Sequence, residues 1–311
     1  MSSRIEWLLF VLLGIMWGSS YVFIKIGVEG GLTPFVLISL RLLIGLAVLA
    51  AVVAIAREPL PRGWRIYGHL AVLGAFSVAI PFCLITWAEV SVDSTIAATI
   101  TSAVPLFVIA FAAVFLRDEP LTLNKLVGVA IGLLGVAILV GFDPASLAGG
   151  SLAAELALVG ATASYAIGGV YARRMVQGLR PMIPALFQVA FAFVMVTVLA
   201  FVFERPLEAP ITPETAFAVA WIGLLGSGIA YLIFFRLLKV WGATRTSLVA
   251  YLLPIVGIAL GALILQEPID AGLLIGTALI IGGIGAVNAR IGSAPLFDRR
   301  SDTSEGLETS R

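Results

Sequence analysis

Hydroxyl-bearing and aromatic side chains within long apolar segments are the first candidates for chemistry in this sequence. Thr95, Thr99 and Ser102 are spaced by four and three residues, so an α-helix would place them on one face. Directed into a cavity beside aromatic rings, such groups suit a zwitterion or another small polar molecule with an apolar part. A single hydroxyl can instead hydrogen-bond its own helix or a neighbouring one. The predicted binding residues are Trp17, Ser20, Tyr21, Thr86, Trp87, Thr99, Ser102, Tyr165, Tyr231 and Tyr251.

The side chains that acid–base, metal or phosphate chemistry requires are scarce. The sequence has one histidine, His69, and one cysteine, Cys83, so a histidine-rich metal site and an intrachain disulfide are excluded. It contains no G-x-x-x-x-G-K-[ST] string for nucleotide phosphates. We therefore expect no enzyme activity, no cofactor, no metal site and no nucleic-acid partner.

The composition is that of a membrane protein. Of 311 residues, 60% are hydrophobic and only 12% are charged, whereas soluble domains carry about 25% charged residues. A helix that crosses the bilayer needs about 20 mostly apolar residues, and reading apolar windows predicts ten such spans. They cover residues 6–27, 34–56, 66–88, 94–116, 121–142, 151–172, 182–203, 214–237, 244–265 and 270–290. The polar tail at 292–311 is expected to be a disordered cytoplasmic segment.

Basic residues alternate between the loops in a way that predicts the orientation. Sixteen of the nineteen Lys and Arg residues fall in one set of loops and in the termini; the exceptions are Lys25, Arg41 and Arg205. Since cytoplasmic loops are enriched in Lys and Arg, we expect both termini to be cytoplasmic. An even number of spans agrees with this orientation.

The second half of the sequence repeats the first with an offset a little under 150 residues. Thr95 through Pro105 parallels Thr244 through Pro254, and each stretch is followed by an acidic-Pro break. With five spans in each half, an odd number, the second copy must enter the membrane from the opposite side. We therefore predict two inverted five-helix repeats, residues 1–145 and 146–291, an arrangement typical of secondary transporters.

Five further residues are predicted to have gating or structural roles: Lys25, Arg41, Pro105, Gln188 and Pro254. Arg41 lies seven residues after the start of its span, about 10 Å along the helix. It could anchor the helix at the interface, or it could pair with a carboxylate or lock a neighbouring helix, and we leave both interpretations open. The two prolines occupy equivalent mid-span positions, where they would kink the helices and could act as pivots.

The ordered motifs also resemble a known family. Trp17-Gly18-Ser19-Ser20-Tyr21 with Lys25, then Arg41, Pro105 and the Asp118-Glu119-Pro120 break, resemble the EamA-type family of the drug/metabolite transporter superfamily. Within it the chain looks most like YddG-type bacterial exporters of amino acids, including aromatic ones. The resemblance implies an all-α integral membrane protein of ten helices that exports amino acids by alternating access around a central cavity. It also implies a multi-pass protein of the bacterial inner membrane.

Several alternatives stay open on the sequence alone. The substrate could belong to another class, such as a nucleoside, a sugar phosphate or a drug. A channel would require a continuous polar lining, and a membrane enzyme would require a cluster of acid, base or metal ligands. No carboxylate lies deep in a span, which favours gradient-driven efflux or exchange, although ion coupling through Glu89 or Asp93 near a span end stays open. We expect a monomer or a weak homodimer in the lipid bilayer.

Overall fold

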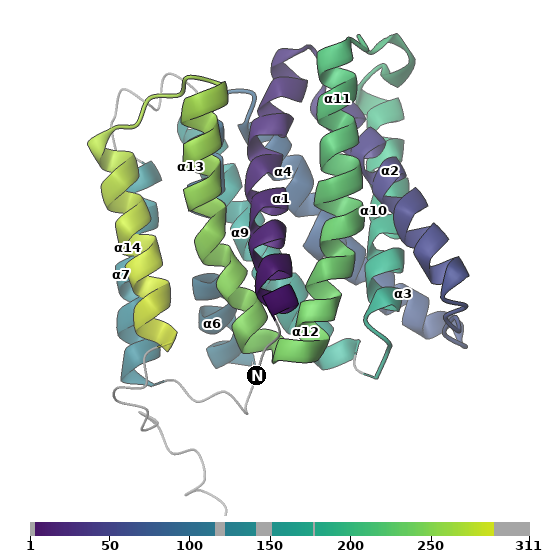
Figure 1. The fold of residues 1–311 in the computed structure, drawn as a ribbon, viewed down its shortest axis with the longest axis horizontal. Coiled ribbons are helices and arrows are strands. Elements are labelled where there is room, and N and C mark those ends of the chain that lie inside the picture. Colours follow the sequence, from purple (N-terminus) through teal and green to yellow (C-terminus); the bar gives the residue numbers. More distant parts are fainter. Residues whose placement is uncertain (1–3, 116–121, 141–150, 177, 289–311) are drawn as a thin grey trace, which may run out of the picture.

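The protein is a bundle of helices that run roughly parallel or antiparallel to one another (Figure 1). The structure, a computed structural model, describes residues 4–115, 122–140, 151–176 and 178–288. The predicted repeat boundary at 145/146 and the predicted tail at 292–311 lie outside these ranges. The first half contains α1 (Arg4–Glu29), α2 (Pro34–Ile55), α3 (Trp64–Gly74), η1 (Ala75–Ala79), α4 (Ile80–Ala88), α5 (Ser94–Thr101), α6 (Val104–Phe115) and α7 (Leu123–Val140). The second contains α9 (Ser151–Met175), α10 (Met182–Phe203), η2 (Pro206–Glu208), α11 (Pro213–Trp221), η3 (Ile222–Ile229), α12 (Ala230–Thr246), η4 (Ser247–Tyr251), α13 (Leu252–Ile264) and α14 (Ala271–Asn288).

These elements confirm the all-helical fold with ten predicted crossings. Eight helical runs are long and apolar enough to span a membrane, and two shorter apolar runs, Leu248–Ile264 and Ala271–Val287, occupy the positions of the last two. Apolar side chains also point outward where lipid would surround the bundle. On α10, for example, Val194, Val198 and Phe201 recur at helical spacing and are 57%, 56% and 60% exposed.

One boundary differs from the prediction. We expected a loop between residues 237 and 244, but α12 stays helical through Thr246 and η4 follows directly. Trp241 explains the difference, because its ring packs 4.8 Å from that of Trp7 and 5.6 Å from that of Phe10. These aromatic contacts hold the end of α12 against the start of α1 and stabilise the helix beyond the apolar window.

Equivalent helices of the two halves pack against each other. At one edge of the bundle α7 lies beside α14, and toward the other edge α2 lies beside α10 (Figure 1). Glu204, directly after the end of α10, contacts the start of α2, so these two helices run antiparallel. Antiparallel pairing of equivalent helices is what the predicted inverted repeat requires.

Both halves interrupt their helices at matching places. The third and eighth crossings contain the π-helical segments η1 and η3. The fourth crossing breaks at Ser102 and Ala103, just before Pro105, and the ninth passes through the 3₁₀ segment η4 just before Pro254. Proline removes a helix hydrogen bond and its ring crowds the carbonyl four residues earlier, which accounts for both breaks.

Acidic side chains bind the starts of helices from the opposite half. The Glu204 carboxylate accepts hydrogen bonds from the Thr33 hydroxyl at 2.6 Å and from the amides of Phe35 and Val36 at 3.1 and 2.9 Å. Glu267 accepts from the first two amides of α5 at 2.8 and 2.9 Å. The first amides of a helix have no partner within it and carry a partial positive charge, so each carboxylate ties two halves together.

Replacing Glu204 with alanine is expected to destabilise the protein by about 1–2 kcal/mol, since three hydrogen bonds at a helix start are lost. Thermal unfolding in detergent, followed by tryptophan fluorescence, measures this as a lower midpoint. Glu208→Ala is the matched control, because Glu208 pairs only with Arg205 on the exposed surface at 3.3 Å. Equal midpoints for the two variants would contradict the stabilising role of the Glu204 contact.

Candidate functional site

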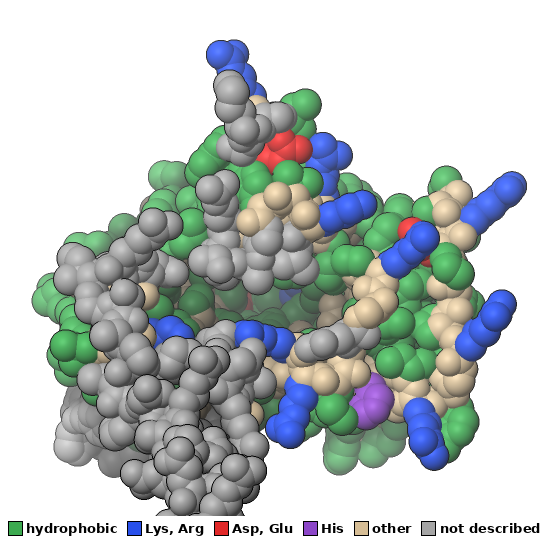
Figure 2. Space-filling view, turned by 90° about the horizontal axis from the view of Figure 1, so that it is seen from below, with side chains coloured by type: hydrophobic (Ala, Val, Ile, Leu, Met, Phe, Trp, Pro, Cys, Tyr) green, Lys and Arg blue, Asp and Glu red, His purple; other side chains and the backbone are tan. Residues whose placement is uncertain are grey.

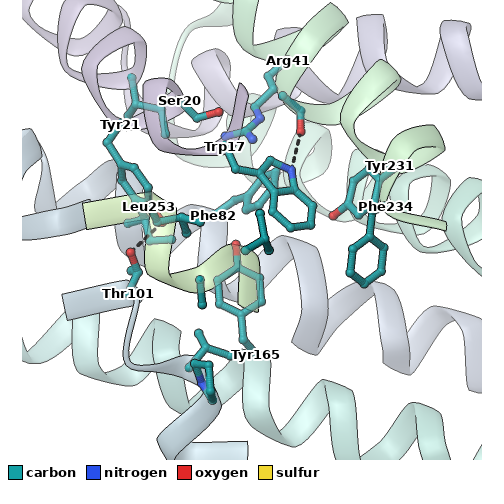
Figure 3. Close-up of a pocket in the computed structure, with 17 residues that line it drawn as sticks. Trp17, Ser20, Tyr21, Arg41, Phe82, Thr101, Tyr165, Tyr231, Phe234 and Leu253 are labelled. Atoms are coloured by element: carbon teal, nitrogen blue, oxygen red, sulfur yellow. Dashed lines mark hydrogen bonds between the residues drawn. The ribbon is translucent and has the colours of Figure 1, made fainter. Parts of the chain in front are cut away.

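A cavity of about 260 Å³ lies in the middle of the bundle (Figure 3). Both halves supply its wall: α1, α2, α4 and the α5–α6 break from the first, and α9, η3, α12, η4 and α13 from the second. The residues come from the interrupted crossings as well as from straight helices. Pro105 itself lines the cavity at the break of the fourth crossing.

Aromatic rings form most of the cavity wall. Trp17 and Tyr21 come from α1, Phe82 from α4, Tyr165 from α9, and Tyr231 and Phe234 from α12. Trp17 packs edge-on against Tyr231 with ring centroids 6.3 Å apart, and tilted against Phe234 at 5.4 Å. A wall of this kind offers large, rigid apolar surfaces to a ligand with a flat or branched apolar group.

Arg41 places a positive charge in this apolar setting. The residue is only 5% exposed, and its guanidinium carbon lies 4.0 Å from the centre of the Phe82 ring. Its Nε donates to the Ser227 hydroxyl at 2.8 Å. No carboxylate of the described residues lies within ion-pair distance of it. A buried guanidinium without an anion is costly, so the cavity is complementary to a negatively charged group.

The other polar groups of the wall divide into bonded and free ones. The hydroxyls of Tyr21 and Thr101 lie 2.6 Å apart, and the Trp17 indole donates to the carbonyl of Gly226 at 3.2 Å. The hydroxyls of Tyr165 and Tyr231 form no hydrogen bond with any described residue, and Figure 3 shows both directed toward the centre. A ligand therefore meets one cation and two free hydroxyls among aromatic rings.

About half of the predicted binding residues lie in the cavity wall. The structure brings together Trp17, Ser20, Tyr21, Tyr165 and Tyr231. Of the predicted gating or structural residues, Arg41 and Pro105 also line the cavity. The tyrosines come from positions 21, 165 and 231, so only folding of both halves around one centre could unite them.

The other predicted binding residues lie outside the lining. Thr99 and Ser102 donate to carbonyls of their own helix at 2.7 and 2.6 Å, the alternative that short-range hydrogen bonding allows. Trp87 is 50% exposed on the outside of the bundle, while the Thr86 hydroxyl is buried and has no hydrogen-bond partner in the described part of the chain. Tyr251 lies near Gly285 of α14.

Three predicted gating or structural residues also lie outside the lining. Gln188 is buried on α10, where its backbone approaches Gly74 closely. Pro254 is buried in α13. Lys25 belongs to the end of the bundle where α1 ends, which the charge pattern predicts to be outside; we call it the outer end.

Sequence reasoning missed Phe82, Phe234 and Leu253, which line the cavity. They carry no polar group, and the sequence contains 18 phenylalanines, so residue type gives no signal for these three. Thr101, in the same hydroxyl-rich stretch as Thr99, also lines the cavity. Its hydroxyl meets Tyr21, a contact across 80 residues that spacing along one helix does not reveal.

Beyond the cavity, the outer end is closed by a layer that we call the outer seal, formed by Lys25, Glu89, Val92, Thr95 and Glu267. The Lys25 ammonium donates to the backbone carbonyls of Glu89 and Val92 at 2.9 and 3.1 Å. Lys25, Glu89 and Glu267 are 9%, 0% and 8% exposed. Charged residues are rarely so buried, so the side chains of this layer pack closely across this end of the bundle.

The opposite, inner end has a different character. Figure 2 shows Lys and Arg side chains spread over its described surface, together with the single histidine, His69. Arg236 reaches from α12 to the carboxylate of Glu6 at 3.1 Å and so joins α12 to the start of α1. The difference in charge between the ends agrees with the expectation that this end is cytoplasmic, which remains a prediction.

Comparison with known proteins gives one family and several relatives. The model of the EamA-like transporter family matches residues 4–141 and again 152–289, once in each half. An uncharacterized inner membrane transporter of Escherichia coli K12, YedA, is 32% identical over 249 residues, 79% of this chain and 78% of its own. A probable amino-acid metabolite efflux pump of Salmonella typhimurium is 26% identical over 295 residues, 91% of this chain and 94% of its own.

A solved crystal structure has the same fold. It superposes with a TM-score of 0.66 and covers 92% of this chain and 97% of its own, at 23% sequence identity. At that identity the likeness concerns the fold alone.

Proposed function

Because the chain belongs to the EamA-like transporter family, we propose that this multi-pass membrane transporter exports amino acids, aromatic ones among them, or related metabolites. Transport would proceed by alternating access around the central cavity. We further propose a bacterial inner membrane with both termini in the cytoplasm, in line with the charge pattern and with the inner membrane relative YedA.

The observation that carries the substrate proposal is the unpaired guanidinium of Arg41 in an aromatic cavity. A carboxylate would accept from its two terminal nitrogens, since the Nε already donates to Ser227. An amino-acid side chain would then lie against Trp17, Tyr231 and Phe234. The name of the Salmonella relative, a probable amino-acid metabolite efflux pump, supports the same class.

The free hydroxyls of Tyr165 and Tyr231 would accept hydrogen bonds from the ammonium group of an amino acid. A phenol oxygen accepts a hydrogen bond as well as donating one, and an ammonium over a tyrosine ring gains cation–π attraction. No carboxylate among the lining residues is available to pair with this ammonium. The site would therefore tolerate amino acids whose amine is modified better than those whose carboxylate is blocked.

Counterflow into proteoliposomes tests this proposal. Vesicles loaded with unlabelled phenylalanine would take up labelled phenylalanine, and four compounds would be added outside as competitors: phenylacetate, phenylalaninamide, phenethylamine and a sugar phosphate. We expect phenylacetate to compete and the two compounds without a carboxylate to be at least about 30-fold weaker, because a charge-assisted pair contributes about 2 kcal/mol or more. Protein-free vesicles correct for passive leakage.

The outcomes separate the alternatives. Equal competition by phenylalaninamide and phenylacetate would show that the carboxylate is not recognised and would overturn the role of Arg41. In vesicles loaded with the sugar phosphate, counterflow of the labelled sugar phosphate without counterflow of phenylalanine would keep the anion site and replace the substrate class. Trp87→Ala is the matched control variant, because this aromatic residue is half exposed outside the cavity and its loss is expected to leave counterflow unchanged.

A further inference from the structure

Glu89 is a buried acid at the end of α4. It follows the last residue of that helix, is 0% exposed, and neither of its carboxylate oxygens has a hydrogen-bond partner among the described residues. An ionised carboxylate in such a place costs several kcal/mol unless it is paired and hydrogen-bonded. The neutral acid avoids most of this cost, so the geometry favours the protonated form.

Charged groups approach Glu89 from three sides. From α1 comes Lys25, whose ammonium is bound to the carbonyls of Glu89 and Val92 and lies 3.7 Å from the exposed Glu29. From the α13–α14 connection comes Glu267, whose carboxylate is occupied by the amides of Ser94 and Thr95. From the cavity side Arg41 of α2 and Tyr21 of α1 lie within electrostatic range.

Together, these neighbours do not balance the negative charge that Glu89 would carry if it were ionised. Burial raises its pKa well above the usual range; Lys25 and, more weakly, Arg41 lower it, while Glu267 raises it. The Lys25 ammonium donates to backbone oxygens and not to the Glu89 carboxylate. Asp93, in the same connection, also has a raised pKa, first through burial and then through Glu267. As an acid it is neutral or negative, so it does not offset the charge of the buried carboxylate.

The position of Glu89 links it to the cavity. Ile85, one helical turn earlier on α4, lines the outer part of the cavity, and so does Ile24, next to Lys25 on α1. Glu89 thus lies one layer beyond the ligand site, inside the outer seal. Opening of the outer end for release of a ligand would separate these layers and admit water to the carboxyl group.

We propose that Glu89 is a proton-binding site that couples transport to the proton gradient. With the outer end open, hydronium from the outside protonates the carboxylate, giving the neutral acid and water, and the outer seal closes over it. Loss of the proton toward the cavity leaves a buried anion, which destabilises the seal and favours reopening. This inference rests on the proposed export function. One cycle then carries a substrate outward and a proton inward.

The pH dependence has a definite sign. An acid whose pKa is higher in the sealed state than in the open state binds more protons when sealed, so low pH favours sealing. Between the open-state pKa, about 4.3 for a hydrated glutamate, and the raised sealed-state pKa, the ratio of sealed to open protein falls about tenfold per pH unit. Below the lower value the ratio no longer changes.

Thiol accessibility measures this ratio without any substrate. In a Cys83→Ser background, Ile85→Cys places a thiol on the inner side of the seal, where a membrane-impermeant maleimide added outside reacts only when the seal opens. We expect the labelling rate to rise at least tenfold from pH 6 to pH 8, normalised to Leu207→Cys, which is 90% exposed. Adding Glu89→Gln, which mimics the neutral acid, should leave labelling slow and independent of pH.

Transport gives the second readout. Efflux from vesicles is expected to accelerate when the outside is acidified, and Glu89→Gln should remove this acceleration. Glu208→Gln, on the exposed surface, is the matched control and should keep it. The same pH profile with and without Glu89→Gln would overturn the proposal. Because labelling needs no substrate, a failed substrate prediction and a failed proton site give different results.

Discussion

Replacing Arg41 with glutamine is expected to reduce counterflow of phenylalanine by about 100-fold. The substrate carboxylate would lose its buried cationic partner, which at other interfaces is worth about 2–5 kcal/mol. Arg41→Lys keeps the charge but loses the bidentate hydrogen-bonding geometry and the planar contact with Phe82 at 4.0 Å. We expect an intermediate loss of about tenfold for this variant.

The readout that separates substrate binding from structure is the preference for a carboxylate. In Arg41→Gln, phenylalaninamide and phenylacetate should compete equally, although both compete weakly. Ser227→Ala is the matched control, since it removes the hydrogen bond to Arg41 Nε and keeps the charge of the guanidinium. It should lower counterflow by less than Arg41→Gln does and should keep the preference for a carboxylate. A retained preference for the carboxylate in Arg41→Gln would show that another group binds it.

Replacing Gly283 with alanine is expected to separate α7 from α14 and to destabilise the protein by about 3 kcal/mol. A Cβ atom at Gly283 would lie 2.5 Å from the carbonyl of Gly128 and 2.7 Å from the amide of Gly132. These are backbone atoms, which cannot rotate away as a side chain can, so the two helices must move apart. Overpacking of this kind costs about 1–3 kcal/mol even where side chains can adjust.

Gly282→Ala is a control one residue away on the same helix. A Cβ there meets nothing within 4 Å, and alanine favours the helix over glycine by about 1 kcal/mol. The unfolding midpoint in detergent should therefore fall for Gly283→Ala and stay unchanged or rise for Gly282→Ala. Similar midpoints for the two variants would contradict the close α7–α14 contact.

The fold could be predicted from the sequence because each crossing leaves a strong local signal. Apolar windows between charged breaks gave the ten crossings, and the spacing between Pro105 and Pro254 gave the repeat. The extension of α12 was missed because it depends on Trp241 meeting Trp7 and Phe10. Contacts between residues more than 200 positions apart cannot be detected in an apolar window of about twenty residues.

The candidate site could be predicted only where side-chain chemistry is unusual for an apolar span. Arg41 and the tyrosines were conspicuous for that reason. The hydroxyls were ambiguous, since Thr99 and Ser102 bond their own helix while Thr101 contacts Tyr21 as well. For the remaining residues, the orientation of the helix about its own axis decides which side chains face the interior. In α4 it buries Thr86 and leaves its neighbour Trp87 facing outward.

The two π-helical segments allow an inference about the history of the chain. The offset of 149 residues between Pro105 and Pro254 carries residues 75–79 to 224–228, within η3 (Ile222–Ile229). A π-turn is a rare and less favourable winding, so its separate origin at the same place in both halves would be a coincidence. We infer that the ancestral five-helix unit already had this turn before its gene was duplicated, and that both descendants have kept it while most of their side chains diverged.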